Sequence, residues 1–541
     1  MAGQLASVSL LAPGFLGINT QDARVGLDSG YAQKANNCVI DKGGRLASRK
    51  GFNMLTTSVG TLGSGKYIES LHEHVDPNGS TEILSAGDGK LFTGTTTLTA
   101  HTLKAADQTT TVSRTFTGSR WQMQSLAKGS GASALNYGIA TQNGNIALVW
   151  RRTSDSVSGT YIWQEIGTYG TVPSGITTFD PDCCLAAFGR IWTAGVTANK
   201  HTLFYSDLLD PTDFTAGSSG VLDISSVVGN NDEIVGLASH NGFLIILCKN
   251  NIVVYQNPSD PTSMSLSDVV NGVGCVSRDT IQSTGTDLIF LSKSGVRSLM
   301  RTIQEKSLPM RELSLNIRDD ITSYLPIEVT PNLIKAGYSE SEAAYIILFP
   351  ANNIMIYFDL RSALENGSAR ATTWSLTNGD VFNSFLQTTD RRFLLGVKNG
   401  IGHYAGYLDN AATYDLTYKS TFSDVGSQGR IVKKFLKRAN LVVDGAGEQD
   451  FVFKYGYDYT LNPRTVTIAR DLGTGVYAKY NTAGSLYNVS EFSSPGIGVH
   501  NIKVPLGGQG ETFAFGIDAT IDDEALSIQK IDLFLKTGKL S

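Results

Sequence analysis

The sequence is poor in charge. Only 17% of its 541 residues are charged, well below the roughly 25% that is usual for soluble domains. Long, charged surface helices are therefore expected to be few. Proline is also scarce, with 14 residues against 57 glycines, so the glycines indicate tight turns between strands and not a collagen-like or linker composition. Together these deficits favour an all-β fold.

Cysteine is sparse and scattered. The five cysteines are Cys38, Cys183, Cys184, Cys248 and Cys275. Their number is odd, and no CxxC pair is matched by further cysteine or histidine ligands. We therefore predict reduced thiols in the core and expect neither a metal site nor a cofactor.

Long apolar runs are missing as well. No run is long enough to span a bilayer, and residues 1–16 lack the cationic start and continuous apolar core of a secretion signal. We expect a soluble chain made in a cytosol, without stable membrane insertion. The net charge of -5 excludes a broadly cationic nucleic-acid binder but allows a local basic stripe.

A loose structural unit recurs along most of the chain. Each unit has a β-rich run, a polar turn containing Gly or Asn, a second apolar run and a longer polar connection. The spacing of the units is close to the ~40–50 residues of propeller blades. Units open near Tyr67, Trp121, Cys183, Ile234, Cys275, Leu333 and Val381.

The clearest hairpin has Asn241-Gly242 at its turn. An Asn-Gly pair between apolar runs requires positive φ and predicts a tight hairpin. The following run, Phe243–Leu247, is continuously apolar, so both faces of its sheet should be covered, as in sheets packed around an axis. A pair of β-sandwich domains would show the same alternation, and a β-helix would show shorter coils. We predict an all-β chain with a β-propeller of six or seven blades and an additional β-sandwich or platform domain.

Two segments interrupt this pattern. Leu313–Tyr324 has helical spacing of apolar residues and predicts a short amphipathic insertion. After about Thr421 the strands become aromatic and the turns Gly-rich, which indicates a separate β domain. We therefore divide the chain into an N-terminal arm (1–60), a β-propeller (61–420) and a C-terminal β domain (421–541).

One strand at the entrance of the last domain is strongly basic. Lysines and arginines that line a DNA channel can contact phosphates. On an edge strand, in contrast, solvated lysines often prevent pairing with a strand of another chain. Both interpretations stay open. The basic candidates for a DNA channel or an interface are Arg430, Lys433, Lys434, Lys437 and Arg438.

No catalytic constellation stands out. His72 and His74 fall on one strand face, but two imidazoles are too few for a metal site and are more simply two exposed strand histidines. The Gly60–Lys66 run lacks the spacing and the hydroxyl residue of a phosphate-binding loop. Asp88 lies in a run that is similar to a sialidase Asp-box but has its Asp one place late, so a tight turn is the better interpretation. We predict no enzyme activity and no catalytic residue.

Several short elements resemble tail nozzle proteins, also called tail hub or tubular tail proteins, of short-tailed bacteriophages. In that family an arm of the type gGvnt leads to a segment of the type aqNv…G.lr.RkG. The matching elements here are Leu11–Thr20, Asn36–Asp41, Gly43–Leu46, Arg49–Phe52, Tyr205–Asp207, Asp210–Phe214, the hairpin Ile234–Tyr255 and Leu526–Phe534.

This resemblance implies a structural virion protein. Such proteins form a ring, here expected to be a homohexamer, beneath the portal and tail adaptor, conduct DNA during ejection and carry fibres or spikes. The arm (1–60) would dock on the platform or on a neighbouring subunit, and the last domain (421–541) would be the platform. The protein would be made in the host cytoplasm and reside in the virion tail, with transient contact to genomic DNA. The alternative is a propeller-type carbohydrate-binding or glycan-degrading tail component.

Overall fold

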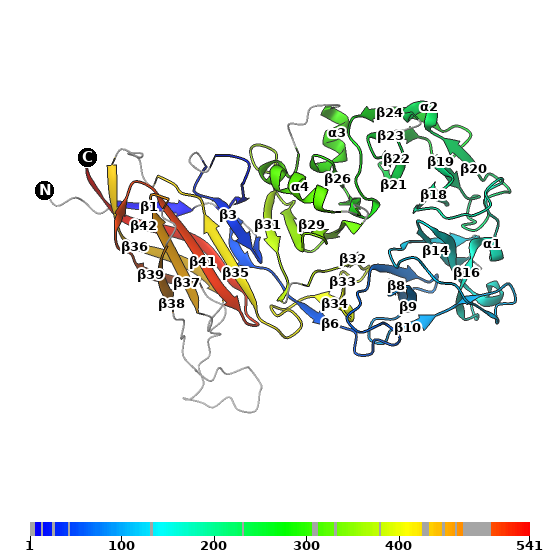
Figure 1. Ribbon diagram of the computed structural model, residues 1–541, viewed down its shortest axis with the longest axis horizontal. Helices are drawn as coiled ribbons and strands as arrows, with labels where there is room; N and C mark the ends of the chain where they lie inside the picture. Colours follow the sequence, from blue (N-terminus) through cyan, green and yellow to red (C-terminus); the bar gives the residue numbers. More distant parts are fainter. Residues whose placement is uncertain are drawn as a thin grey trace.

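Two β-structures lie side by side in the computed structural model: a ring of small sheets and a two-sheet platform (Figure 1). The description covers residues 6–11, 14–23, 27–41, 44–129, 134–229, 232–305, 312–328, 330, 333–377, 380–424, 432–445, 450–459, 463–468 and 499–540. The N-terminal strand and the C-terminal strand both belong to the platform, at the end of the molecule away from the ring.

Six separate sheets, antiparallel except where β11 pairs with β16, form blades of a β-propeller, which confirms the predicted fold class. The first three blades contain β7–β10 (Ser70–Val75, Thr81–Gly87, Lys90–Thr93, Thr99–His101), β11–β16 (Leu103–Lys104, Thr111–Val112, Gln122–Lys128, Leu135–Gln142, Asn145–Arg152, Tyr161–Glu165) and β17–β20 (Cys183–Ala187, Arg190–Val196, Asn199–Tyr205, Gly220–Asp223). The others contain β21–β24 (Ile234–His240, Phe243–Cys248, Asn251–Gln256, Ser265–Asn271), β25–β27 (Gln282–Ser283, Leu288–Ser292, Gly295–Ser298) and β32–β34 (Ser384–Gln387, Phe393–Val397, Gly400–Tyr404) with β6 (Phe52–Met54).

The first four strands of a larger sheet also form part of the ring. Strands β28–β31 (Lys335–Ser339, Ala344–Phe349, Ile354–Asp359, Arg370–Trp374) lie between the blades of β25–β27 and β32–β34, and β28 contacts β25 and β32. The innermost strands β7, β13, β17, β21, β25, β28 and β32 begin at or close to the seven predicted unit openings. The unit pattern in the sequence therefore located these strands correctly.

Two sheets make the platform. Sheet A contains β1 (Ala6–Leu11), β4 (Cys38–Ile40), β5 (Leu46–Ser48), β36 (Val432–Gly445), β39 (Val499–Pro505), β40 (Gln509–Gly510) and β42 (Leu526–Leu540). Sheet B continues from β31 through β3 (Tyr31–Asn36), β35 (Tyr414–Ser420), β41 (Phe513–Ile521), β37 (Phe451–Tyr457) and β38 (Arg464–Ile468), with β2 (Gly17–Ile18) beside β3. Sheet B thus joins the propeller and the platform in one hydrogen-bonded structure.

Sheets A and B share one apolar core. The inward residues alternate along each strand, as a half-buried sheet requires: Leu441 and Val443 of β36 and Leu533 and Leu535 of β42 pack in the same cluster as Phe515 of sheet B. The polar residues between them therefore lie on the outer faces, which point to opposite sides of the sandwich. These outer faces are the surfaces available to partners.

Helices are few and short among the described residues. They are α1 (Ile166–Tyr169), α2 (Ser225–Val228), α3 (Leu299–Glu305) and α4 (Arg318–Tyr324), with 3-10 turns η3 (Thr153–Asp155), η4 (Arg278–Thr280), η6 (Leu315–Ile317) and η7 (Leu325–Ile327). Segments η6 and α4 confirm the helical insertion predicted over Leu313–Tyr324, with Ile317 and Ile321 buried. Among all the residues that the structure describes, no helix is long and apolar enough to cross a membrane. All five cysteines are buried free thiols, as predicted.

Candidate functional site

The predicted basic residues do not form one uniform row. Lys433 and Lys437 of β36 are exposed, whereas Lys434 is buried and donates from its Nζ to the carbonyl of Glu511 at 3.2 Å. Arg438 is half-buried, and its guanidinium lies 4.1 Å from the ring centre of Phe534. Arg430 lies outside the described residues. Lys434 thus points toward the interior side of sheet A.

A β-bulge explains this arrangement. In the pairing of β36 with β42, Leu436 faces Leu535 and Arg438 faces Phe534, so Lys437 is the additional residue. Leu436 and Ala439 can therefore both enter the core although they are three residues apart, and Lys437 and Arg438 both stay outside it.

Three further lysines join them on the outer face of sheet A. Their cross-strand partners are outward residues of β36: Lys503 of β39 pairs with Asn440, Lys530 of β42 with Val442, and Lys536 of β42 with Phe435. Residues that pair directly across strands lie on the same face of a sheet. We call this surface the basic face; its cations are Lys433, Lys437, Arg438, Lys503, Lys530 and Lys536.

Acidic groups on the same face are fewer. Asp532 lies 3.0 Å from the Nζ of Lys530 and accepts a hydrogen bond from Ser9 at 2.8 Å, and Asp444 pairs with Arg45 at 3.0 Å. The alternation of Lys530, Asp532 and Lys536 along β42 was visible in the sequence. Its proximity to Lys433 and Lys437 was not, because only the strand register brings residues about a hundred positions apart together.

The outer face of sheet B is acidic at one end. A surface depression of about 630 Å³ is lined by Asp415, Asp450, Asp518 and Asp522, with Val452 among its apolar residues. Asp415 accepts a hydrogen bond from the hydroxyl of Thr520 at 2.8 Å. We call this the acidic depression. No local sequence pattern predicts it, because its carboxylates come from separate segments: Asp415 and Asp518 lie in β35 and β41, Asp450 directly precedes β37, and Asp522 directly follows β41.

A row of lysines lies at the other end of that face. Lys34, Lys419 and Lys454 belong to three strands, and the cross-strand register aligns them around Gly516. Lys454 forms an ion pair with Asp518, which stands between the two regions. The outer face of sheet B therefore has an acidic end and a basic end.

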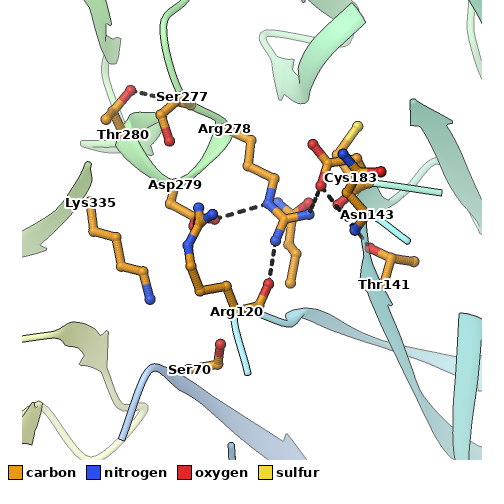
Figure 2. Close-up of polar contacts among 12 residues, drawn as sticks. Ser70, Arg120, Thr141, Asn143, Cys183, Ser277, Arg278, Asp279, Thr280 and Lys335 are labelled. Atoms are coloured by element: carbon orange, nitrogen blue, oxygen red, sulfur yellow. Dashed lines mark hydrogen bonds and ion pairs between the residues drawn. The ribbon is translucent and has the colours of Figure 1, made fainter. Parts of the chain in front are cut away.

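A second cluster of charges lies where the innermost strands of the propeller begin (Figure 2). Arg278 of η4 pairs with Asp182 at 2.7 Å, and Arg120 pairs with Asp279 at 2.7 Å. Arg278 also donates to the carbonyl of Arg120, and Lys335 of β28 donates to the carbonyl of Glu69, just before β7. This network joins several blades through groups of both signs.

Burial sets the protonation of this cluster. Removal from water lowers the pKa of Lys335 to about 7, and the nearby Asp279 only partly opposes that effect. Burial alone would raise the pKa of Asp279, but the positive charges of Arg278 and Arg120 bring it below its usual range. The cluster is thus a set of compensated charges that fixes the blades at the axis.

The two histidines of β7 are not exposed strand residues, so that interpretation was wrong. His74 is only 1% exposed, and the rings of His72 and His74 both hydrogen-bond to Oγ of Ser125, at 2.8 and 2.9 Å. Burial lowers the pKa of His72 to about 3 and that of His74 to about 4, so both rings are neutral at physiological pH. Within the described residues no group of three or more His, Cys, Asp or Glu side chains could hold a metal ion.

No protein family and no curated protein matches this chain. Solved structures with a similar arrangement include the extracellular domain of hybrid two component system BT3049 from B. thetaiotaomicron, at 13% identity and a TM-score of 0.37, covering 77% of this chain and 48% of that chain. The WD40 β-propeller domain of Doa1 has 10% identity and a TM-score of 0.34, over 65% of this chain and 96% of that chain. The Neurospora crassa Pan2 WD40 domain has 10% identity and a TM-score of 0.32, over 68% and 88%. The chain spans about half the length of the first of these, and such low identities concern the fold alone.

Proposed function

We propose that this chain is a structural subunit of a short bacteriophage tail and not an enzyme. Identical copies, six by the resemblance, would form the ring-shaped nozzle at the distal end of the tail. DNA would leave through that ring, the tail adaptor and portal ring would lie above it, and fibres or spikes would attach to it.

The observation that carries this proposal is the position of the residues behind the resemblance. Arg49 of the Arg49–Phe52 element is fully buried, and its guanidinium donates to both carboxylate oxygens of Asp409 at 2.8 and 2.7 Å. The same guanidinium reaches Oδ1 of Asn37 at 3.0 Å and the carbonyl of Ser375 at 3.0 Å. These contacts join the segments that enter and leave the propeller.

Other residues of these elements have the same kind of role. Gly51 passes so close to Leu408 that a Cβ would overlap its carbonyl, and Asn37 has a positive φ of 56°. The Leu526–Phe534 element forms most of the long strand β42, the centre of sheet A. These residues of the resemblance therefore hold the propeller and the platform together, which suits a structural subunit.

Purified protein tests this proposal directly. Native mass spectrometry and negative-stain images should show a closed ring of six copies, alone or on the tail adaptor. A chain that stays monomeric and never joins tails would contradict the proposal. Incubation with host polysaccharide followed by a reducing-end assay should release nothing; release would favour the glycan-degrading alternative.

A further inference from the structure

The platform carries opposite charges on its two outer faces. Among the described residues, the basic face has six cations against Asp532 and Asp444, whereas the acidic depression gathers four carboxylates, of which Asp518 pairs with Lys454. The two surfaces belong to different sheets of one sandwich, so they point to opposite sides. One copy thus exposes a basic surface on one side and an acidic surface on the opposite side.

We propose that the basic face of one copy binds the acidic depression of the next copy. Such a contact is heterologous, because two different surfaces of the same chain meet, and it closes into a ring when the rotation between copies allows it. This inference rests on the proposed ring and adds which surfaces build it.

Charge complementarity favours a second copy over nucleic acid as the occupant. Complementary potentials across an interface guide association and suppress wrong pairings. The chain as a whole has a net charge of -5, which repels a polyanion at long range, yet it supplies four carboxylates in a depression about 630 Å³ in volume. Lys433 and Lys437 are exposed on a long strand at the outer surface, where they can reach such a depression.

Apolar groups lie within both surfaces. Phe435 and Phe534 stand among the cations of the basic face, and Val452 lines the acidic depression. Both phenylalanines and Val452 are half-buried in the single chain, so contact with a neighbour would remove further apolar area from water. The row of Lys34, Lys419 and Lys454 would repel the basic face, which restricts docking to the acidic end of sheet B.

A charge-swap experiment with the full chain tests the proposal. Variant one is Lys433→Glu with Lys437→Glu, and variant two is Asp415→Lys with Asp522→Lys. Each variant cancels the net charge of one of the two surfaces and places like charges opposite each other at the substituted positions, so each alone should associate at least about tenfold more weakly than the wild type at low salt. In an equal mixture the unchanged basic face of variant two meets the unchanged acidic depression of variant one, and at the other contact the new glutamates face the new lysines, so rings of alternating copies should form.

Controls and readouts make the outcomes distinct. Lys66→Glu with Lys293→Glu reverses two exposed lysines on the propeller and should assemble like the wild type. Far-ultraviolet circular dichroism and thermal melts show whether each variant is folded, and native mass spectrometry of differently tagged variants shows alternation. Assembly should weaken between 0.05 and 0.5 M salt.

Three results would overturn the interface. They are a wild type that remains monomeric, folded variants that assemble normally, and a mixture that does not recover. Assembly unchanged but DNA retention lost in variant one would assign the basic face to a DNA-contacting wall instead. Alternating rings that never join a tail adaptor or tails would support this interface and contradict the proposed function.

Discussion

At the scale of single residues, the described structure depends on buried ion pairs between segments far apart in sequence. Arg49 and Asp409 are 360 positions apart, and their side chains are 0% and 3% exposed. A buried charge is costly to desolvate, so it is stable only while its partner is present. Arg49 is therefore the residue at which a single substitution should most weaken the junction between the propeller and the platform.

Replacing Arg49 by Met should cost about 3–5 kcal/mol in the free energy of unfolding, because Asp409 then remains buried without its partner. Urea unfolding followed by tryptophan fluorescence measures this loss. The matched control is Arg45→Met, since Arg45 pairs with Asp41 at 2.9 Å but is 28% exposed, and it should cost under about 1 kcal/mol. Equal losses in the two variants would show that the buried pair has no special role.

Lys335 should make stability depend on pH. Its pKa is lowered to about 7 in the folded chain from 10.5, so between these values the unfolded chain holds a proton that the folded chain lacks. Stability should therefore rise with pH from about 7 to 10, by at most about 1.4 kcal/mol per pH unit. Thermal melts of wild type and Lys335→Met at pH 6 to 9.5 measure the difference in slope. A variant that retains the wild-type slope would assign the pH dependence to other groups.

At the scale of elements, the hairpin turns specify the blades. Asn241 and Gly242 have φ values of 48° and 81°, the positive values that the Asn-Gly pair predicted. A Cβ on Gly242 would meet nothing within 4 Å, so a substitution there changes backbone energy without any steric clash.

Gly242→Ala should therefore destabilise the protein by about 1 kcal/mol, from the cost of a positive φ in a residue with a Cβ. Asn241→Gly is the matched control, because glycine accepts that conformation and should change the stability by only a few tenths of a kcal/mol. Chemical denaturation of both variants beside the wild type gives the comparison. A neutral Gly242→Ala would mean that the turn relaxes to another geometry.

The strands and turns of the blades show which parts of the fold can be predicted from the sequence. Local signals, such as Asn-Gly turns and apolar runs, located the innermost strands because strand and turn chemistry is encoded within a few neighbouring residues. The alignment of Lys503 with Asn440, and the pairing of β6 with β34, depend on register between distant segments. No local pattern encodes such a register, so the basic strand was found and the basic face was not.

At the scale of the whole molecule, the ring is closed by a strand from the beginning of the chain. β6 pairs with β34 and completes the last blade, whose first strand β32 contacts β7 of the first blade. Phe52 of β6 is 8% exposed and packs edge-on against Phe382, with 5.6 Å between ring centres. The same short segment around β6 therefore closes the ring and attaches it to the platform.

Phe52→Ala should weaken this closure beyond its own blade. Loss of a buried phenylalanine costs about 3–5 kcal/mol, and opening of β6 exposes the edge of β34 and the contact with the first blade. Hydrogen exchange should become faster in β32–β34 and also in β7–β10. The matched control is Phe204→Ala, a 4% exposed residue of β19 that packs between the blades of β11–β16 and β17–β20, so faster exchange should stay within these two blades and not reach β32–β34. If Phe52→Ala accelerates exchange only in its own blade, then β6 completes that blade without closing the ring. Cooperative unfolding of the blades would then depend on sheet B.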